Sequence, residues 1–252
     1  MKLSVCLDAL YNGKDFFASL EEVRAIGYDT VEFWSWWDKD VERLAQLASD
    51  YNMTIASMCV KSANLVDESL REAYLEGLRE SIAAAKQLNC RTLILTVGQE
   101  LADVSREVQQ QSIIDGLRAS APLVEEAGIT IVLEPLNTLV DHKGYYLSSS
   151  EQAFDIIRQV GSTNVKLVFD IYHQQIMEGN LLANILPNLE LIGHFHAAGN
   201  PGRHELSSGE LHYGRIFDAI DAAGYEGYMG LEYFPIAAPE VGLKELLAEV
   251  SV

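Results

Sequence analysis

The sequence predicts an α/β protein of the (β/α)8, or TIM-barrel, class, with residues 1–252 forming one domain. Short apolar runs rich in β-branched residues alternate with longer helical patterns along the chain, and each kind occurs eight times in strict order. This alternation is typical of a parallel sheet, and eight units favour its closure into a barrel. A length of 252 residues suits one barrel, although length alone would also allow two smaller domains.

The strands are expected where apolar runs are short and bounded by turn residues. The first four runs read LSVCL, DTVEFW, TIASMCV and RTLILTV, and each of the last four closes on an acidic or imidazole side chain. The expected strands are residues 3–7, 29–34, 54–60, 91–97, 129–134, 165–170, 190–196 and 227–232.

The helices are expected where apolar residues recur every three or four positions. Residues 69–89 show the pattern best, with a stripe of Leu70, Tyr74, Leu78, Ile82 and Ala85. Three glycines, at 27, 128 and 224, fall just past helical patterns, where a left-handed residue is favoured. The expected helices are residues 15–26, 39–51, 67–88, 103–127, 149–160, 180–187, 214–224 and 239–250.

Composition narrows the choice of partners and compartment. The net charge of −19 would repel a polyanion, so we expect no nucleic-acid partner. No apolar stretch approaches 18 residues and the N-terminus has no long apolar segment, which predicts a cytoplasmic protein without a membrane span. The three cysteines, Cys6, Cys59 and Cys90, are odd in number and well separated, so we expect buried thiols rather than disulfides.

Four acidic or imidazole side chains stand where four successive strands are expected to end: Glu134, Asp170, His196 and Glu232. They are separated by 36, 26 and 36 positions, which is about the length of one βα unit. Since a parallel barrel gathers its strand ends at one mouth, these side chains should converge. A ligand set of three oxygens and one nitrogen suits Mn²⁺, Mg²⁺ or Co²⁺. It differs from a zinc site that is rich in thiolates.

Two further polar residues are expected near this site. His194 lies two positions before His196 and therefore shares its face of the strand, one layer deeper in the barrel. A hydrogen-bonded core histidine is the plainer interpretation of His194. Glu32 ends the second expected strand, and its direction, inward to the floor of the site or outward, is left open by the pattern.

Local motifs in the second half of the chain resemble a known family. EPLN (134–137), DIYHQQIMEG (170–179), IGHFHAAGNPGRHEL (192–206), SGELHY (208–213) and GLEYFP (230–235) are similar to hydroxypyruvate isomerases. These belong to the xylose-isomerase-like superfamily of sugar isomerases and epimerases, in which the ketose 3-epimerases are near cousins. The motifs cover much of residues 129–235, and the barrel pattern covers the whole chain.

The resemblance implies a divalent metal on the four residues above, with Glu134 and Glu232 as the proton-transferring pair. It also implies that His173 and Arg203 contact substrate oxygens. The plainer alternatives are packing of His173 under its loop and a surface ion pair of Arg203 with Glu205 or Glu210. One departure concerns His196, because hydroxypyruvate isomerases often carry glutamine there whereas the epimerases carry histidine.

The chemistry expected of such a site is proton transfer next to a carbonyl group. Removing a proton from an α-hydroxycarbonyl compound gives an enediolate, and a chelating divalent ion offsets its negative charge. Return of the proton to the neighbouring carbon gives isomerisation, and return to the opposite face of the same carbon gives epimerisation. A hydroxypyruvate isomerase-like activity is the first hypothesis, and a ketose 3-epimerase is the second.

Residues after other expected strands are also candidates for substrate binding. Trp34 follows the second strand in FWSWW and could stack on a sugar, although lid packing explains it equally well. Lys61 follows the third strand and could meet a substrate carboxylate or phosphate together with Arg203. No glycine-rich phosphate-binding motif is visible, so we expect an unphosphorylated small-molecule substrate. Family members often pair, which makes a homo-oligomer plausible.

Two other classes of protein compete with the isomerase. A DNA-repair endonuclease on the same barrel binds three zinc ions and needs several more histidines than MCVKSAN (58–64), LTVGQE (95–100) and GRH (202–204) supply. The negative charge also argues against DNA. The other competitor is a non-catalytic barrel that binds a metal or a sugar, which the sequence does not exclude.

Overall fold

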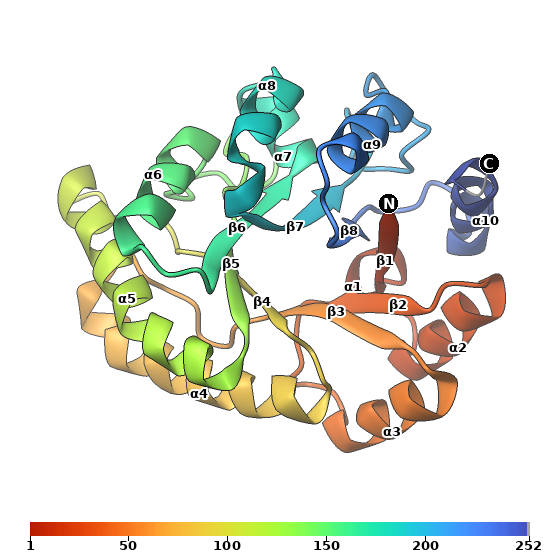
Figure 1. Ribbon diagram of the computed structural model, residues 1–252, viewed down its shortest axis with the longest axis horizontal. Coiled ribbons are helices and arrows are strands. Elements are labelled where there is room, and N and C mark those ends of the chain that lie inside the picture. The colour runs from red at the N-terminus through yellow and green to blue at the C-terminus, as the bar shows by residue number, and fades with distance from the viewer. Residues whose placement is uncertain (251–252) are drawn as a thin grey trace.

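Eight parallel strands form a closed barrel in the computed structural model, which describes residues 1–250 (Figure 1). Each strand pairs with its sequence neighbours, and β1 closes the ring by pairing with β8. The expected (β/α)8 class is therefore confirmed. The strands are β1 (Lys2–Cys6), β2 (Thr30–Phe33), β3 (Thr54–Cys59), β4 (Thr92–Leu95), β5 (Thr130–Leu133), β6 (Val165–Asp170), β7 (Ile192–Ala197) and β8 (Tyr228–Leu231).

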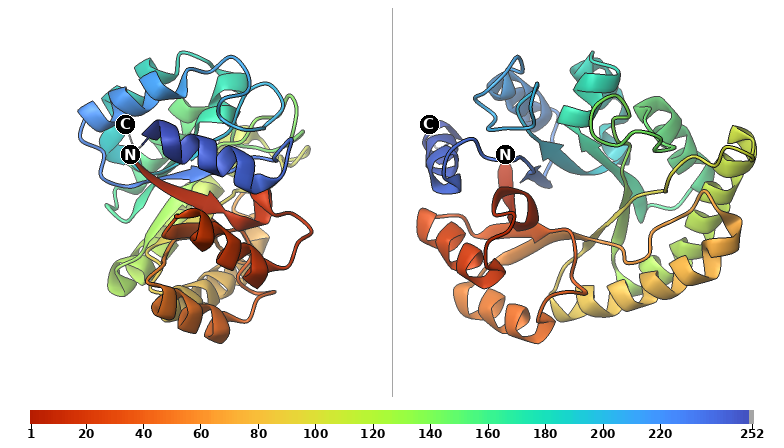
Figure 2. Two further views of the ribbon diagram at one scale, coloured as in Figure 1. Left: turned by 90° about the vertical axis from the view of Figure 1, so that its right-hand side faces the viewer. Right: turned by 180° about the vertical axis from the view of Figure 1, so that it is seen from behind.

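Helices surround the strands as an outer layer, and both chain ends lie on the side of α10 (Figures 1 and 2). The helices are α1 (Leu7–Leu10), α2 (Phe16–Ile26), α3 (Val41–Tyr51), α4 (Arg71–Gln87), α5 (Arg106–Ala127), α6 (Ser150–Val160), α7 (Ile171–Met177), α8 (Leu181–Ile185), α9 (Tyr213–Ala222) and α10 (Pro239–Val250). Two 3-10 turns precede α4 and β7, namely η1 (Glu68–Leu70) and η2 (Leu186–Leu191).

Side chains and glycines set the helix ends. The carboxylate of Asp15 accepts a hydrogen bond from the Ala18 amide at the start of α2, and Asp40, Ser105 and Ser149 cap α3, α5 and α6 in the same way. Gly27 and Gly128 have positive φ angles of 118° and 66° just past α2 and α5, as expected. The chain therefore turns sharply from each of these helices into the next strand.

The structure differs from the sequence-based expectation at several elements. Helices α1 and α7 were not expected, because elements of four and seven residues are too short to show a helical period. The expected strand 190–196 begins only at Ile192, because Pro187 opens a 3-10 turn that extends to Leu191. Leu70 belongs to η1 and is 40% exposed, so the buried stripe of α4 starts at Tyr74.

The barrel interior has an apolar part and a polar part. Ile94, Val132 and Val168, from β4, β5 and β6, form a small apolar cluster with Cys59 that is separate from the main core. The main core lies between the strands and the helices. Cys6, Cys59 and Cys90 are free thiols, as expected, and Cys59 is the least buried of them.

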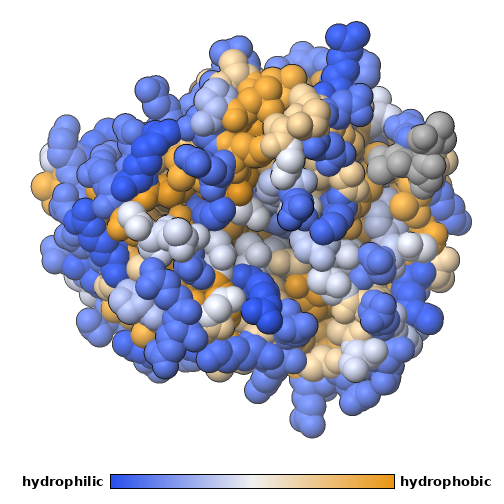
Figure 3. Space-filling view, viewed as in Figure 1, coloured by the Kyte–Doolittle hydropathy of each residue, from blue (hydrophilic) through white to orange (hydrophobic). Residues whose placement is uncertain are grey.

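The face shown in Figure 3 is mostly hydrophilic, with a hydrophobic patch near its upper edge. Among residues 1–250, no helix combines the length and the apolar character that crossing a lipid bilayer would need.

A substitution at Gly193 would test the packing of the barrel interior. A Cβ atom at this position of β7 would lie 2.8 Å from Cγ1 of Val132 and 3.2 Å from Cβ of Lys166. We expect Gly193→Val to lower the free energy of unfolding by about 1–3 kcal/mol through overpacking. Denaturant unfolding would measure this. Gly214→Ala is the control, because its Cβ would lie no closer than 3.5 Å to a neighbour, and a wild-type-like Gly193→Val would refute this packing.

Candidate functional site

The four side chains expected at the barrel mouth do meet there. Glu134 and Glu232 each follow directly on a strand, β5 and β8, while Asp170 ends β6 and His196 is the fifth residue of β7. All four are buried, with exposed fractions of 1–6%. Asp170 and His196 are also register partners across β6 and β7, so the sheet itself brings them together.

The imidazole of His196 lies among the three carboxylates. Its Nδ1 is 3.1 Å from Oε1 of Glu134, 3.6 Å from Oε2 of Glu232 and 4.0 Å from Oδ2 of Asp170. We call Glu134, Asp170, His196 and Glu232 the mouth cluster. A hard cation with bonds of about 2.1–2.4 Å would hold neighbouring ligand atoms roughly 3.0–3.4 Å apart and opposite ones roughly 4.2–4.8 Å apart. The three distances from Nδ1 of His196 lie within the limits of 3.0 and 4.8 Å that this geometry sets.

Asp170 serves two purposes with its two oxygens. Oδ1 accepts a hydrogen bond from the His173 amide at 3.0 Å and so caps α7. Oδ2 faces the cluster, 4.0 Å from Nδ1 of His196 and 3.6 Å from Nε2 of His173. The helix cap and the site position therefore coexist, because each uses a different oxygen.

His173 approaches the carboxylates from the first turn of α7. Ligand atoms of Glu134, Asp170, His173 and Glu232 all lie within 4.8 Å of one another. The ring is fully buried, and its Nε2 has no hydrogen-bond partner among the described residues. Burial and the positive charge of Arg203 hold the pKa of His173 well below its usual value, so the ring is neutral.

Asn137 decides which nitrogen of His173 carries the proton. Its Oδ1 accepts from the amides of Val140 and Asp141, both at 3.0 Å, so its Nδ2 must be the atom 2.6 Å from Nδ1 of His173. Nδ1 therefore accepts and Nε2 carries the hydrogen. A protonated nitrogen cannot bind a metal, so His173 presents a hydrogen-bond donor to the site. This role of Asn137 depends on a contact between the loop after β5 and helix α7, and it has no signal in the sequence beyond its place in EPLN.

Arg203 is part of the site rather than of the surface. Its guanidinium pairs with Oε2 of Glu232, and its side chain is buried against the rings of Tyr172 and Phe234 at 5.5 and 5.6 Å. The alternative of a surface ion pair with Glu205 or Glu210 is wrong in this structure, where Glu205 accepts from the Ile236 amide and Glu210 contacts Gln175 and Asn200.

Trp34 reaches the cluster through its indole N–H, which donates to Oε1 of Glu232 at 2.5 Å. The loop that carries it is held by Asp8, whose Oδ2 accepts from the amides of Trp34 and Ser35 at 2.7 and 3.2 Å. Trp34 also lines a cavity of about 270 Å³ together with Tyr11 and Asn12. Trp34 therefore borders both this cavity and the mouth cluster.

Lys61 is not brought to the cluster. Its ammonium lies 2.5 Å from Oε2 of Glu80 on α4 and 5.8 Å from the ring of Trp36. The side chain of Lys61 is 38% exposed. The β3 end places the residue near the mouth, but the acidic side chain on α4 draws the ammonium outward. The expected role of Lys61 in binding substrate therefore has no support in this geometry.

Beneath the mouth cluster lies a buried ion pair that answers the open question about Glu32. The Glu32 side chain points inward, with Oε2 3.0 Å from Nε2 of His194 and Oε1 3.0 Å from Nε2 of His196. His194 is thus a hydrogen-bonded histidine of the barrel floor, as the plainer interpretation held. All three side chains are about 1% exposed.

The environment affects the two glutamates of the mouth cluster in opposite directions. Burial raises the pKa of Glu134 above its usual value, although His196 opposes this. Burial also disfavours ionisation of Glu232, but His196 and Arg203 outweigh it, and the pKa of Glu232 is lowered. For His196, burial is outweighed by Glu232 and Glu32, so the pKa of the ring is well above its usual value. The cluster therefore combines carboxylates of unequal acidity.

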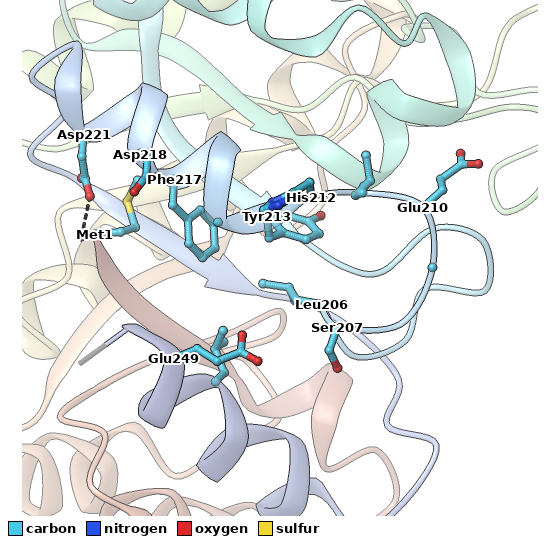
Figure 4. A pocket seen from close by; sticks show the side chains of 14 residues that line it. Met1, Leu206, Ser207, Glu210, His212, Tyr213, Phe217, Asp218, Asp221 and Glu249 are labelled. Atoms are coloured by element: carbon cyan, nitrogen blue, oxygen red, sulfur yellow. Dashed lines mark hydrogen bonds and ion pairs between the residues drawn. The ribbon is translucent and has the colours of Figure 1, made fainter. Parts of the chain in front are cut away.

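A larger cavity of about 650 Å³ lies elsewhere, between α9 and α10 (Figure 4). Its wall includes Met1, Phe217 and Leu246, with the amino terminus paired to Asp221 at 2.9 Å. No residue of the mouth cluster lines it. Size alone would point to this cavity, but the convergent titratable groups lie at the barrel mouth.

Comparison with known proteins agrees with this arrangement. A family model described as "Xylose isomerase-like TIM barrel" matches residues 20–249. The chain belongs to this family. It is 31% identical to the hydroxypyruvate isomerase of Escherichia coli (strain K12), over 97% of each chain. It is also 30% identical to the 2-oxo-tetronate isomerase of Cupriavidus necator, over 94% of each chain. The chain is therefore an enzyme of the isomerase or epimerase class.

Solved structures share the fold over nearly the whole chain. A structure described as an AP endonuclease, family 2, from Brucella melitensis has a TM-score of 0.93 and 26% identity, covering 98% of both chains. An L-ribulose 3-epimerase has a TM-score of 0.83 and 22% identity, covering 100% of this chain and 94% of the other. The IolI protein with a bound zinc atom has a TM-score of 0.83 and 18% identity, covering 100% and 97%. The last two likenesses concern the fold alone.

The tautomer of His173 can be measured directly. We expect ¹⁵N spectra of the ring to show a proton on Nε2 and none on Nδ1, because Asn137 donates to Nδ1. In Asn137→Leu both tautomers should be populated, since Nδ1 then loses its donor. Asn188→Leu, on η2, is the control and should leave the ring unchanged. A wild-type ring protonated on Nδ1 would contradict this assignment.

Proposed function

We propose that this protein is a divalent-metal-dependent isomerase of small hydroxycarbonyl compounds, with hydroxypyruvate as its first candidate substrate. The observation that supports this most strongly is the convergence of Glu134, Asp170, His196 and Glu232 from four successive strands at one mouth. The names of the two curated relatives favour a 2-oxo acid as substrate. A single domain over residues 1–252, a cytoplasmic location and a homo-oligomeric state remain predictions.

We infer that the four residues of the mouth cluster hold the metal, with Nδ1 of His196 as the nitrogen ligand. Oxygen-rich sites of this kind suit Mn²⁺ or Mg²⁺, and Co²⁺ is also compatible. When bound, such an ion would polarise the substrate carbonyl and stabilise negative charge that develops on its oxygens. His173 is a weaker candidate ligand, because Asn137 keeps its proton on Nε2.

Glu134 and Glu232 are the proposed proton-transferring pair. They come from β5 and β8, on well-separated parts of the barrel, so they can approach a substrate from two directions. One carboxylate removes the proton next to the carbonyl, and an enediolate results. The same carboxylate or the other one then donates a proton to the neighbouring carbon. The hydroxyl proton passes to the former carbonyl oxygen, and the carbonyl group has moved by one position.

His173, Arg203 and Trp34 are proposed to bind the substrate. His173 offers a buried Nε2–H with no partner among the described residues, which can donate to a substrate oxygen. Arg203 offers a buried guanidinium that faces Glu232 and can pair with the carboxylate of a 2-oxo acid. These two groups supply the positive and donor character that an anionic substrate needs in an acidic mouth.

A ketose 3-epimerase is the second candidate, favoured by His196. Hydroxypyruvate isomerases resembling this chain often have glutamine at that position, and epimerases have histidine. Both reactions start with the same proton abstraction, so the residues assigned above would serve either. A non-catalytic barrel has less support, because the curated relatives are isomerases.

A DNA-repair endonuclease has little support despite the description of one structural neighbour. A three-zinc site needs additional histidines, and His204, the residue nearest to the expected position, is turned away. Its Nδ1 contacts the carbonyl oxygen of Phe234 at 2.7 Å. The net charge of −19 is also unfavourable for approach to DNA.

The first test replaces each glutamate in turn. We expect Glu134→Gln and Glu232→Gln to lower turnover of hydroxypyruvate by roughly 10²–10⁴-fold or more, because an amide cannot take the proton. The same proton transfer can be measured on a panel of ketoses in D₂O, as incorporation of deuterium at the carbon next to the carbonyl. Glu76→Gln, on the exposed face of α4, is the control. Wild-type rates in either cluster variant would refute the assigned pair.

The second test removes the metal. We expect treatment with a chelator to abolish proton exchange and Mn²⁺ to restore it, with calorimetry showing one ion bound per chain at micromolar concentration. Asp170→Asn should weaken this binding, whereas Asp155→Asn, on the exposed face of α6, should not. Activity that survives complete metal removal would contradict the proposed mechanism.

A further inference from the structure

Glu32 occupies a position that the proposed chemistry does not use. It is the third residue of β2, yet its carboxylate crosses the barrel interior to two histidines of β7. The Glu32 side chain is about 2% exposed, and its carboxylate lies below the mouth cluster rather than in it. Ionised groups at this depth are costly unless they are paired, so the arrangement needs an explanation.

The ring of His196 connects Glu32 to the mouth cluster. Nδ1 faces the three carboxylates of the cluster, and Nε2 faces Glu32 on the opposite edge of the ring. Carboxylates face both nitrogens, and they hold the ring positively charged while no ion is bound. A cation on Nδ1 needs the lone pair of that nitrogen, so the proton that the ring keeps would then lie on Nε2, beside Glu32. A neutral imidazole carries one proton, and Nδ1 then presents a lone pair to the cluster.

The neighbours of Glu32 hold it in this position. Oε2 of Glu32 is 3.0 Å from Nε2 of His194. The ring of His194 packs edge-on against that of His196, with 5.1 Å between centroids. Gly230 of β8 provides the space, because a Cβ there would lie 2.7 Å from both Cδ of Glu32 and Cδ2 of His196. The contact between Oε1 of Glu32 and Nε2 of His196 is 3.0 Å but is not aligned as a hydrogen bond. Proximity and charge, rather than ideal hydrogen-bond geometry, hold this side of the ring.

We propose that Glu32 is a positioning residue for the divalent cation: it retains the proton on Nε2 of His196 and turns Nδ1 toward Glu134, Asp170 and Glu232. This inference rests on the metal site of the proposed function. Partners of this kind orient metal-binding histidines in other proteins, and their loss typically weakens metal binding about 10–100-fold.

One competing explanation uses the same residues. Glu32, His194 and His196 also offer ligand atoms within 4.8 Å of one another and could hold an ion of their own. We favour positioning because a neutral imidazole has a single lone pair to offer, and three carboxylates face Nδ1 of His196 whereas only Glu32 faces its Nε2. The number of ions bound per chain separates the two explanations.

The test compares wild type with Glu32→Gln, which keeps the shape of the side chain but loses the charge. We expect calorimetry with Mn²⁺ to give one ion per chain in both proteins, with a dissociation constant at least tenfold higher in the variant. In the Zn²⁺-loaded protein, ¹⁵N spectra should show a proton on Nε2 of His196, and this proton should exchange with water faster in Glu32→Gln. Glu178→Gln, after α7, is the control for losing one carboxylate elsewhere.

The outcomes distinguish this inference from the proposed function. Unchanged affinity and unchanged proton exchange in a folded Glu32→Gln would overturn the role of Glu32 alone. Two ions in wild type and one in the variant would overturn it in favour of an ion at the floor. A wild-type protein that binds no Mn²⁺ would refute the metal site and this inference together. If Glu32→Gln does not fold, the wild-type ring still decides, because a proton on Nδ1 in the loaded protein would overturn the assignment.

Discussion

The concentration of negative charge at the barrel mouth is the constraint around which the rest of the site is arranged. Three carboxylates lie within a few ångströms of one ring nitrogen and are buried, which is unfavourable without compensation. The positive charges that face them come from His196 and Arg203, and the Trp34 indole adds a hydrogen bond to Glu232. His196 and Arg203 therefore offset the negative charge of the carboxylates, and Trp34 helps to orient one of them.

The division of the barrel interior follows from the same constraint. Small and branched apolar residues of β4, β5 and β6 fill one part, and Glu32 and two histidines fill the other. Both parts leave no space for an added methyl group at the nearest glycines. A Cβ at Gly193 would meet Val132, and one at Gly230 would meet His196. The packing of the barrel floor and the geometry of the mouth cluster therefore both depend on the same tightly packed barrel interior.

Strand order and strand ends could be predicted from sequence because they depend on local patterns. The ending of LVFD at Asp170 and of GLE at Glu232 follows from the apolar runs, and a barrel brings such ends together whatever the loops do. The inward direction of Glu32 and the outward direction of Lys61 could not be predicted, because each depends on a partner from another element, His194 and Glu80 respectively. The Asn137–His173 contact could not be predicted for the same reason, since it joins the loop after β5 to helix α7, 36 positions along the chain.

The first half of the chain carries none of the four proposed ligands, yet two of its side chains contact the side chains of His196 and Glu232. Glu32 meets His196 from below, and Trp34 meets Glu232 from the side, within three positions of each other on β2 and its following loop. A fragment containing only β5 to β8 would keep all four proposed ligands. It would lack both the support that stops one ring from turning and the donor that steadies one carboxylate. Half a barrel with a complete set of ligands would thus be an incomplete enzyme.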